Sequence, residues 1–145
     1  MPDVLDHLLA KPGLYVGSQS DPTGGHGHPP GQSRVNVTKL PGGSGVLMEY
    51  EVLSEAGRVH WEQAMLARTT AGLILVTAHT HADVATVIHE TEPGVFPATP
   101  DASPFPVAIK LEVPEPGHLI YTWSYGRPGE AAVPRDIGDL HLVDG

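Results

Sequence analysis

Two histidines, His79 and His81, are two residues apart in a segment rich in apolar side chains. Residues at positions i and i+2 of an extended strand point to the same face, so both imidazoles would lie together. Neutral imidazole is a good ligand for zinc, iron and copper. The pair therefore predicts a metal site with His79 and His81 as its ligands.

Three further polar residues, His60, Glu62 and Arg68, share one parity of the preceding segment. If that face points inward, a carboxylate, a guanidinium and imidazoles meet in one polar cluster. An arginine there would hold an anionic head group through two hydrogen bonds, which makes Arg68 a candidate ligand-binding residue. Leu66 lies on the same parity and favours an inward face, but the pattern equally allows that this face meets solvent.

Aromatic side chains alternate later in the chain, where Tyr121, Trp123 and Tyr125 fall on one parity. Such rings give a ligand apolar walls with a polar edge. Tyr121 and Trp123 are therefore candidate ligand-binding residues, although plain core packing would produce the same stripe.

Sequence patterns of nucleophilic catalysis are absent. The chain has no cysteine, no Gly-x-Ser-x-Gly elbow and no glycine-rich phosphate loop between a strand and a helix. Thiol chemistry is excluded, and enzymatic activity is left undecided.

The histidines and charged residues lie in a run of four predicted β-strands between residues 46 and 90. Apolar and polar side chains alternate there with a period of two. Gly57 and Gly72 fall in the turns, where a positive φ is often required. Strands this close in sequence pair antiparallel, so the run predicts a meander.

The rest of the chain adds strands and one helix. A short helix is predicted over residues 4–10, because Asp3 can cap it and its apolar side chains form one stripe. Two polar segments rich in glycine and proline, residues 18–32 and 91–106, are predicted loops, and the histidines of residues 26–28 (HGH) are interpreted as solvated. Further strands are predicted over residues 14–18, 34–40, 107–113, 119–125 and 140–143.

Antiparallel strands in this number must close or stack to hide their edges. The sequence therefore predicts an all-β fold: one domain over residues 1–145, built as an up-and-down antiparallel barrel of about eight to ten strands with one short N-terminal helix. The interior of such a barrel can hold one small ligand.

The formal net charge is −9. A surface of that sign excludes nucleic acid as a partner and does not favour an anionic membrane. No stretch reaches transmembrane length, and the first residues lack the pattern of a signal peptide, so we expect a cytoplasmic protein. Self-association as a homodimer is left open.

Three segments carry a resemblance to a known family. They are residues 13–18 (GLYVGS), residues 60–72 with His60, Glu62 and Arg68 before a glycine turn, and residues 78–90, where Ala78-His79-Thr80 precedes a strand ending in a glutamate. Over about residues 5–94 the chain resembles the calycin (lipocalin and fatty-acid-binding) superfamily, and within it the nitrobindin-like barrels. The resemblance implies a calycin-like barrel that binds haem through a histidine on a strand near the C-terminus, for which His141 is the candidate.

Three functional hypotheses follow. The first is a small-molecule-binding barrel that encloses an apolar ligand, with haem as the named candidate. The second is a cupin-like metal-dependent enzyme that uses His79, His81 and either Glu90 or Glu62. The third is a structural or partner-binding barrel with a filled core and no ligand.

Overall fold

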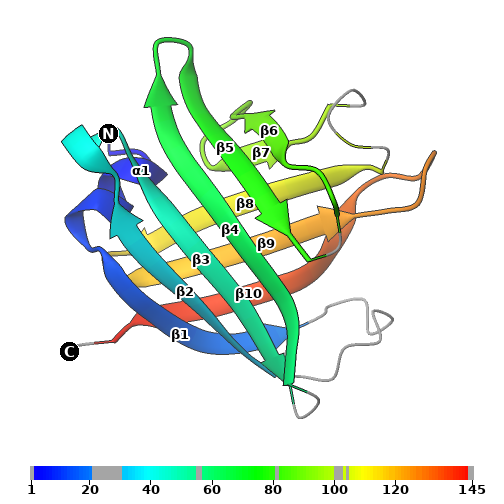
Figure 1. The fold of residues 1–145 in the computed structure, drawn as a ribbon, viewed down its shortest axis with the longest axis horizontal. Helices are drawn as coiled ribbons and strands as arrows, with labels where there is room; N and C mark the ends of the chain where they lie inside the picture. The colour runs from blue at the N-terminus through cyan, green and yellow to red at the C-terminus, as the bar shows by residue number, and fades with distance from the viewer. Residues whose placement is uncertain are drawn as a thin grey trace.

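The computed structural model describes residues 2–20, 31–54, 57–80, 82–99, 103 and 105–143. These residues form one α-helix, ten β-strands and one short 3-10 helix (Figure 1). Their bounds in chain order are α1 Val4–Ala10, β1 Gly13–Ser20, β2 Gly31–Lys39, η1 Pro41–Gly43, β3 Gly45–Ser54, β4 Gly57–Thr69, β5 Gly72–His79, β6 Thr86–His89, β7 Val95–Pro97, β8 Val107–Glu115, β9 His118–Tyr125 and β10 Val133–Leu142.

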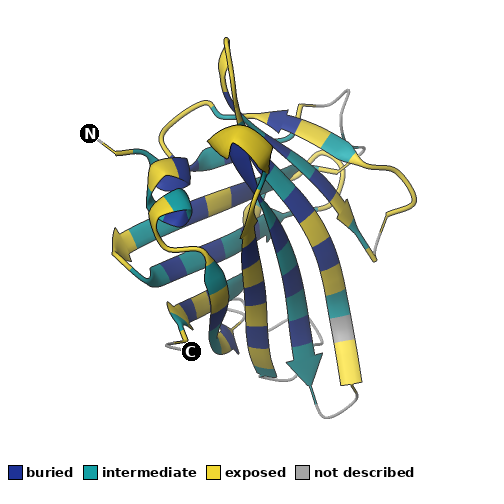
Figure 2. Cartoon of the chain, turned by 60° about the vertical axis from the view of Figure 1, so that its left-hand side comes forward, coloured by how far each residue is buried: buried dark blue, intermediate teal, exposed yellow. Residues whose placement is uncertain are grey.

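The helix α1 has the residues and the cap that the sequence predicts. Asp3 accepts a hydrogen bond from the backbone N–H of Asp6 at 2.8 Å, and the Asp6 carboxylate accepts one from the N–H of Asp3 at 3.0 Å. Val4, Leu5 and Leu8 are buried, and this face of the helix turns toward the strands (Figure 2). Because this helix is too short to cross a bilayer, no described helix could span a membrane.

The strands form one antiparallel sheet in the order β6-β5-β4-β3-β2-β1-β10-β9-β8-β7. Strands adjacent in sequence are neighbours in the sheet, except that β1 pairs with β10 and β6 is not paired with β7. The sheet curls until β6 and β7 contact each other, so that β1–β5 cross over β8–β10 (Figure 1). The predicted all-β, up-and-down, nearly closed barrel with one short N-terminal helix is confirmed.

The sequential strand order also decides against the cupin alternative as a fold. A cupin is a double-sheet jelly roll made of two Greek keys, whereas here the chain runs up and down through neighbouring strands. A metal-dependent enzyme of cupin architecture is therefore not what this chain forms.

The central meander matches the prediction closely, and its turns use the expected glycines. Gly57 has φ 98° and Gly72 has φ 114°, values that an L side chain rarely adopts. The differences lie at the C-terminal side. Residues 95–97 form β7 inside a predicted loop, and β10 begins at Val133 instead of residue 140. β7 is a three-residue edge strand that contains Pro97, and Pro134 interrupts the apolar pattern at the start of β10. Both features hid the strand pairings from the sequence pattern.

Gly17 lies in the middle of β1. In the structure β1 stays paired on both sides through this residue. A Cβ at Gly17 would lie 1.7 Å from the carbonyl oxygen of Asp139. The glycine is therefore needed because β10 passes very close to it along the strongly curved β1 (Figure 1).

Burial alternates along the strands and decides which parity faces inward (Figure 2). On β4 the side chains of Glu62, Ala64 and Leu66 are fully buried, while Trp61 and Gln63 are exposed. The parity that carries the charged candidate residues thus points into the barrel. The end of the interior next to α1 is filled by apolar side chains that include Leu5, Leu8, Val46, Met48, Leu66, Leu75, Ile109, Leu111 and Leu119.

Candidate ligand-binding site

The other end of the barrel, opposite α1, is hollow. A cavity of about 820 Å³ is lined by residues of β3, β4, β5, β6, β8, β9 and β10, by the segments that flank β6 and β7, and by the start of the connection between β9 and β10. Volumes of roughly 300–1,000 Å³ are typical of sites for small organic ligands. The described residues therefore do not fill the barrel completely, in contrast to the filled core that the third hypothesis assumes.

A buried carboxylate, Glu62, lies beneath this cavity. Its side chain is 0% exposed, and the Tyr121 hydroxyl and the Trp123 indole N–H both donate hydrogen bonds to it, the latter at 2.9 Å. The His60 Nε2 atom lies 3.2 Å from Glu62 Oε1. A charged group is tolerated in an interior only when such partners satisfy it, so these three residues and Glu62 form one polar unit.

Aromatic rings pack around that unit. Tyr50 meets Tyr121 edge to face at a centroid distance of 4.5 Å, and its hydroxyl donates to Gln19 Oε1 at 2.8 Å. The His79 ring stacks on His60 at 5.8 Å and meets Trp123 edge to face at 5.1 Å. These contacts fix the ring positions, because edge-to-face and offset aromatic pairs are favourable and directional.

Tyr50, His60, His79 and Trp123 line the cavity, whereas Tyr121 lies below them, fully buried. We call these five residues together with Glu62 the cavity floor. It offers a ligand apolar ring faces and two imidazoles, supported from behind by a carboxylate.

Burial sets the ionisation of the floor. It raises the pKa of the Tyr121 and Tyr50 hydroxyls well above the usual tyrosine value, and the nearby Glu62 carboxylate adds to both shifts. Burial lowers the pKa of His79, which the Glu62 charge opposes and the neighbouring His60 reinforces. Neutral phenols and a neutral His79 imidazole are thus favoured at pH 7.

Charged residues lie toward the solvent side of the cavity. Arg127, Arg135, Asp83 and Asp136 contribute to its lining. The Arg135 Nε atom donates to the Tyr125 carbonyl oxygen at 2.9 Å, and its guanidinium lies 5.5 Å from the centre of the Tyr125 ring. Two cations and two anions balance, so the rim does not select strongly for the net charge of a ligand.

The cavity reaches the seam between β6 and β7, where the barrel is not closed by backbone hydrogen bonds of the described strands. Val84 and Phe105 line the cavity there and are 64% and 53% exposed. Large apolar side chains that are both exposed and at a cavity wall give the seam the character of a ligand passage.

Of the candidate ligand-binding residues, the structure brings His79, Tyr121 and Trp123 together around Glu62. His81 is outside the described residues.

Arg68 does not join this group. It lies eight residues after His60 on β4, about 26 Å along an extended strand, at the end covered by α1. Its guanidinium is 47% exposed and binds the carboxylates of Asp3 and Asp6 at 2.8 and 3.0 Å. Arg68 shares the inward parity of β4, but its place near the strand end turns it to the N-terminal cap of the helix instead of to a ligand.

His141 also lies away from the cavity. Its neighbour Leu140 is fully buried, so the alternation of β10 turns His141 to the outer face, where its side chain is 64% exposed. The expectation of an interior haem ligand at this position has to be corrected, because the register of β10 places Leu140 inward.

Sequence reasoning placed His60 and Glu62 on one face but did not identify Glu62 as the centre of a site, and it missed Tyr50 as part of the same floor. The available signal was a glutamate on the same parity as Ala64 and Leu66, because a carboxylate on a buried face requires partners. The partners themselves, on β9, are 59 and 61 residues away in sequence, and no local pattern links them.

These features define an antiparallel β-barrel with a ligand-sized cavity at one end. A scan against protein-family models and a search of curated proteins both found no match. Among solved structures, the chain is similar to the one titled "Crystal Structure of Rv2717c from M. tuberculosis", with a TM-score of 0.64 and 16% sequence identity over 95% of this chain and 98% of that one. At this identity the similarity shows a shared fold.

Proposed function

We propose that this protein binds a small, largely apolar molecule in the cavity at the barrel end opposite α1. The observation that carries the proposal is a cavity of about 820 Å³ above a floor of aromatic rings, in a barrel whose other half is tightly filled. Burial of apolar ligand surface would supply most of the affinity, and the two imidazoles would orient the ligand.

Haem is the specific ligand that we propose first, in line with the resemblance of the sequence to nitrobindin-like barrels. Three properties of the cavity support it: its volume, its aromatic walls and the histidines His60 and His79 in its lining. Imidazole is a common protein ligand of haem iron. Haem held by these residues would supply an iron centre able to bind a further small molecule.

His79 is the residue that we assign to the iron, in place of His141. Its lowered pKa keeps the imidazole neutral and able to coordinate. Glu62 lies behind His60 and His79, and a carboxylate near a ligating histidine is a frequent arrangement because it steadies the ring.

A hemin titration followed by absorption tests the assignment. We expect a sharp Soret band at one haem per chain, retained in His141→Ala and lost or strongly shifted in His79→Ala. His141→Ala is a matched control, because it removes an imidazole from the outer face of the same barrel. Loss of the band in His141→Ala alone would overturn the assignment to His79.

A second titration with a fluorescent apolar probe separates the general proposal from the haem proposal. If the probe binds, Trp123→Ala weakens its binding and hemin does not bind, the proposal of an apolar ligand stands and the haem proposal is rejected. Failure of both hemin and the probe to bind the folded protein would reject the binding function. Metal analysis of the same sample, repeated with His79→Ala, tests for a metal bound at the His79 and His81 pair. A metal that this change removes would instead favour a metal-dependent activity.

A further inference from the structure

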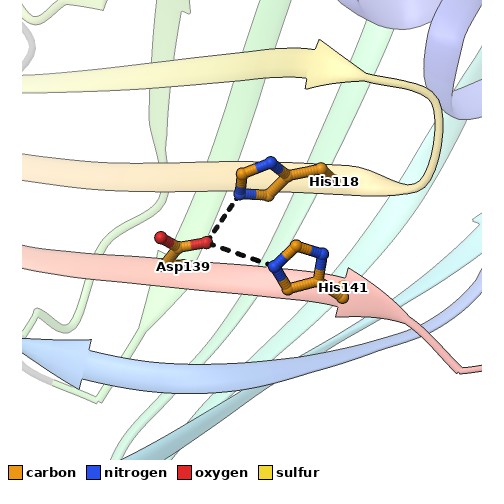
Figure 3. A group of neighbouring side chains, drawn as sticks. All are labelled: His118, Asp139 and His141. Atoms are coloured by element: carbon orange, nitrogen blue, oxygen red, sulfur yellow. Dashed lines mark hydrogen bonds and ion pairs between the residues drawn. The ribbon is translucent and has the colours of Figure 1, made fainter.

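Three ionisable side chains gather on the outer face of the barrel, far from the cavity floor. His118 comes from the start of β9, and Asp139 and His141 come from β10 (Figure 3). The His118 Nε2 atom lies 2.6 Å from Asp139 Oδ1, and the His141 Nε2 atom lies 3.7 Å from the same oxygen. Each of the two imidazoles therefore directs its Nε2 atom at the same oxygen of Asp139.

The sheet holds this arrangement in place. His118 and His141 are directly opposite each other in the antiparallel pairing of β9 and β10. Asp139 is two residues before His141 and so points to the same face. The two imidazole rings stack at a centroid distance of 4.2 Å with an angle of 18° between their planes. All three groups are thus positioned by paired strands and not by a loop.

We propose that His118, Asp139 and His141 form a surface site for a divalent transition-metal ion, with Zn²⁺ as the best match. The three ligand atoms all lie within 4.8 Å of one another. Donor atoms about 2.0–2.2 Å from a tetrahedral zinc are about 3.4 Å apart. The two distances to the Asp139 oxygen, 2.6 and 3.7 Å, fall on either side of that value.

The chemistry of the three groups also matches. Two neutral imidazoles and one carboxylate form a common ligand set for zinc, with the fourth position left to water. A metal ion would take the place of the hydrogen bond between His118 and Asp139. Small rotations are available to complete the geometry, because Asp139 and His141 are exposed, and the formal net charge of −9 favours a cation at the surface.

This site is separate from the proposed ligand cavity. Leu140, between Asp139 and His141, is fully buried and points into the barrel, so the two neighbours project outward. Metal bound outside should leave the cavity floor unchanged. Haem binding and metal binding can consequently be measured independently on the same protein.

Isothermal titration of the full chain with ZnCl₂ tests the proposal, together with Co²⁺ absorption as a probe of tetrahedral coordination. We expect one tight equivalent, weakened at least about tenfold in His118→Ala, in His141→Ala and in Asp139→Asn, since loss of even an outer partner of a metal ligand costs 10–100-fold. Binding should weaken as the pH falls, because protons compete with the metal for the imidazoles.

Two control variants remove histidines elsewhere. His89→Ala removes an exposed imidazole on β6, and the double change His26→Ala with His28→Ala removes the closely spaced pair that lies outside the described residues. Both should retain the tight equivalent. Retention of full affinity in His118→Ala or His141→Ala, or loss of the site in the His26 and His28 control, would overturn the proposal. Circular dichroism verifies that each variant is folded.

Discussion

Glu62 is the residue on which the cavity floor depends most. Replacing it with alanine removes the acceptor for the Tyr121 hydroxyl and the Trp123 indole N–H and leaves a void in the core. An orphaned buried donor costs about 1–3 kcal/mol. We expect Glu62→Ala to lower the free energy of unfolding by about 2–5 kcal/mol, measured by urea denaturation.

Glu49→Ala is the matched control for that measurement. Glu49 lies on the outward parity of β3, where a substitution usually changes stability by less than about 0.5 kcal/mol. Equal losses of unfolding free energy in the two variants would show that the hydrogen bonds of Glu62 do not stabilise the fold.

His79 gives the floor a pH dependence. Burial lowers its pKa in the folded protein, so the unfolded chain takes up the proton first as the pH falls below its usual value of about 6.5. Protonation then favours unfolding, and the stability contributed by neutral His79 is present above about pH 6.5 and is lost below it.

We therefore expect the free energy of unfolding to fall between pH 7 and pH 5, and the fall to be smaller in His79→Gln. Urea denaturation at several pH values gives both slopes. His89→Gln, which changes an exposed histidine of β6, should keep the slope of the parent protein. If the free energy of unfolding of His79→Gln falls with pH as steeply as that of the parent protein, His79 is not the source of the pH dependence.

At the scale of elements, the seam between β6 and β7 is the weakest part of the barrel. β6 has four residues and β7 has three, and each is hydrogen-bonded to a strand on one side only. β3 and β4, in contrast, are long and have a partner on both sides. Edge strands with few backbone partners open locally at low cost.

Hydrogen–deuterium exchange should follow this difference. Amides of β6 and β7 are expected to exchange fastest among the strands, and those of β3 and β4 slowest. A ligand in the cavity should slow amide exchange at the seam, because Val84 and Phe105 lie at the seam and also line the cavity. Protection at β3 and β4 without any change at the seam would argue that ligands enter elsewhere.

At the scale of the whole molecule, ligand binding and stability are linked. A compound that binds the folded barrel and not the unfolded chain raises the free energy of unfolding by about 2.7 kcal/mol at 100 times its dissociation constant. Hemin or an apolar probe at that concentration should therefore raise the urea midpoint. Trp123→Ala should reduce this gain, while His141→Ala, on the outer face, should not; the reverse pattern would place the ligand outside the cavity.

Much of the fold follows from local sequence alone. Period-two alternation in β3 and β4, the positive-φ glycines Gly57 and Gly72, and the Asp3 cap of α1 each reflect neighbouring residues. A meander of such strands has few ways to hide its edges, which made the barrel predictable. A short edge strand such as β7 could not be predicted. It has only three residues, one of which is Pro97, and so few residues carry too weak an alternation pattern.

The site depended on tertiary structure. Alternation groups residues by face but does not say which face is inside, and shifting a strand by one residue reverses the answer. That choice put Glu62 and His79 at the cavity floor and His141 outside. It also brought His118 and His141, 23 positions apart in the numbering, into direct cross-strand contact. The register with which β10 pairs to β9 creates this neighbour pair, and the alternation within either strand alone does not specify that register.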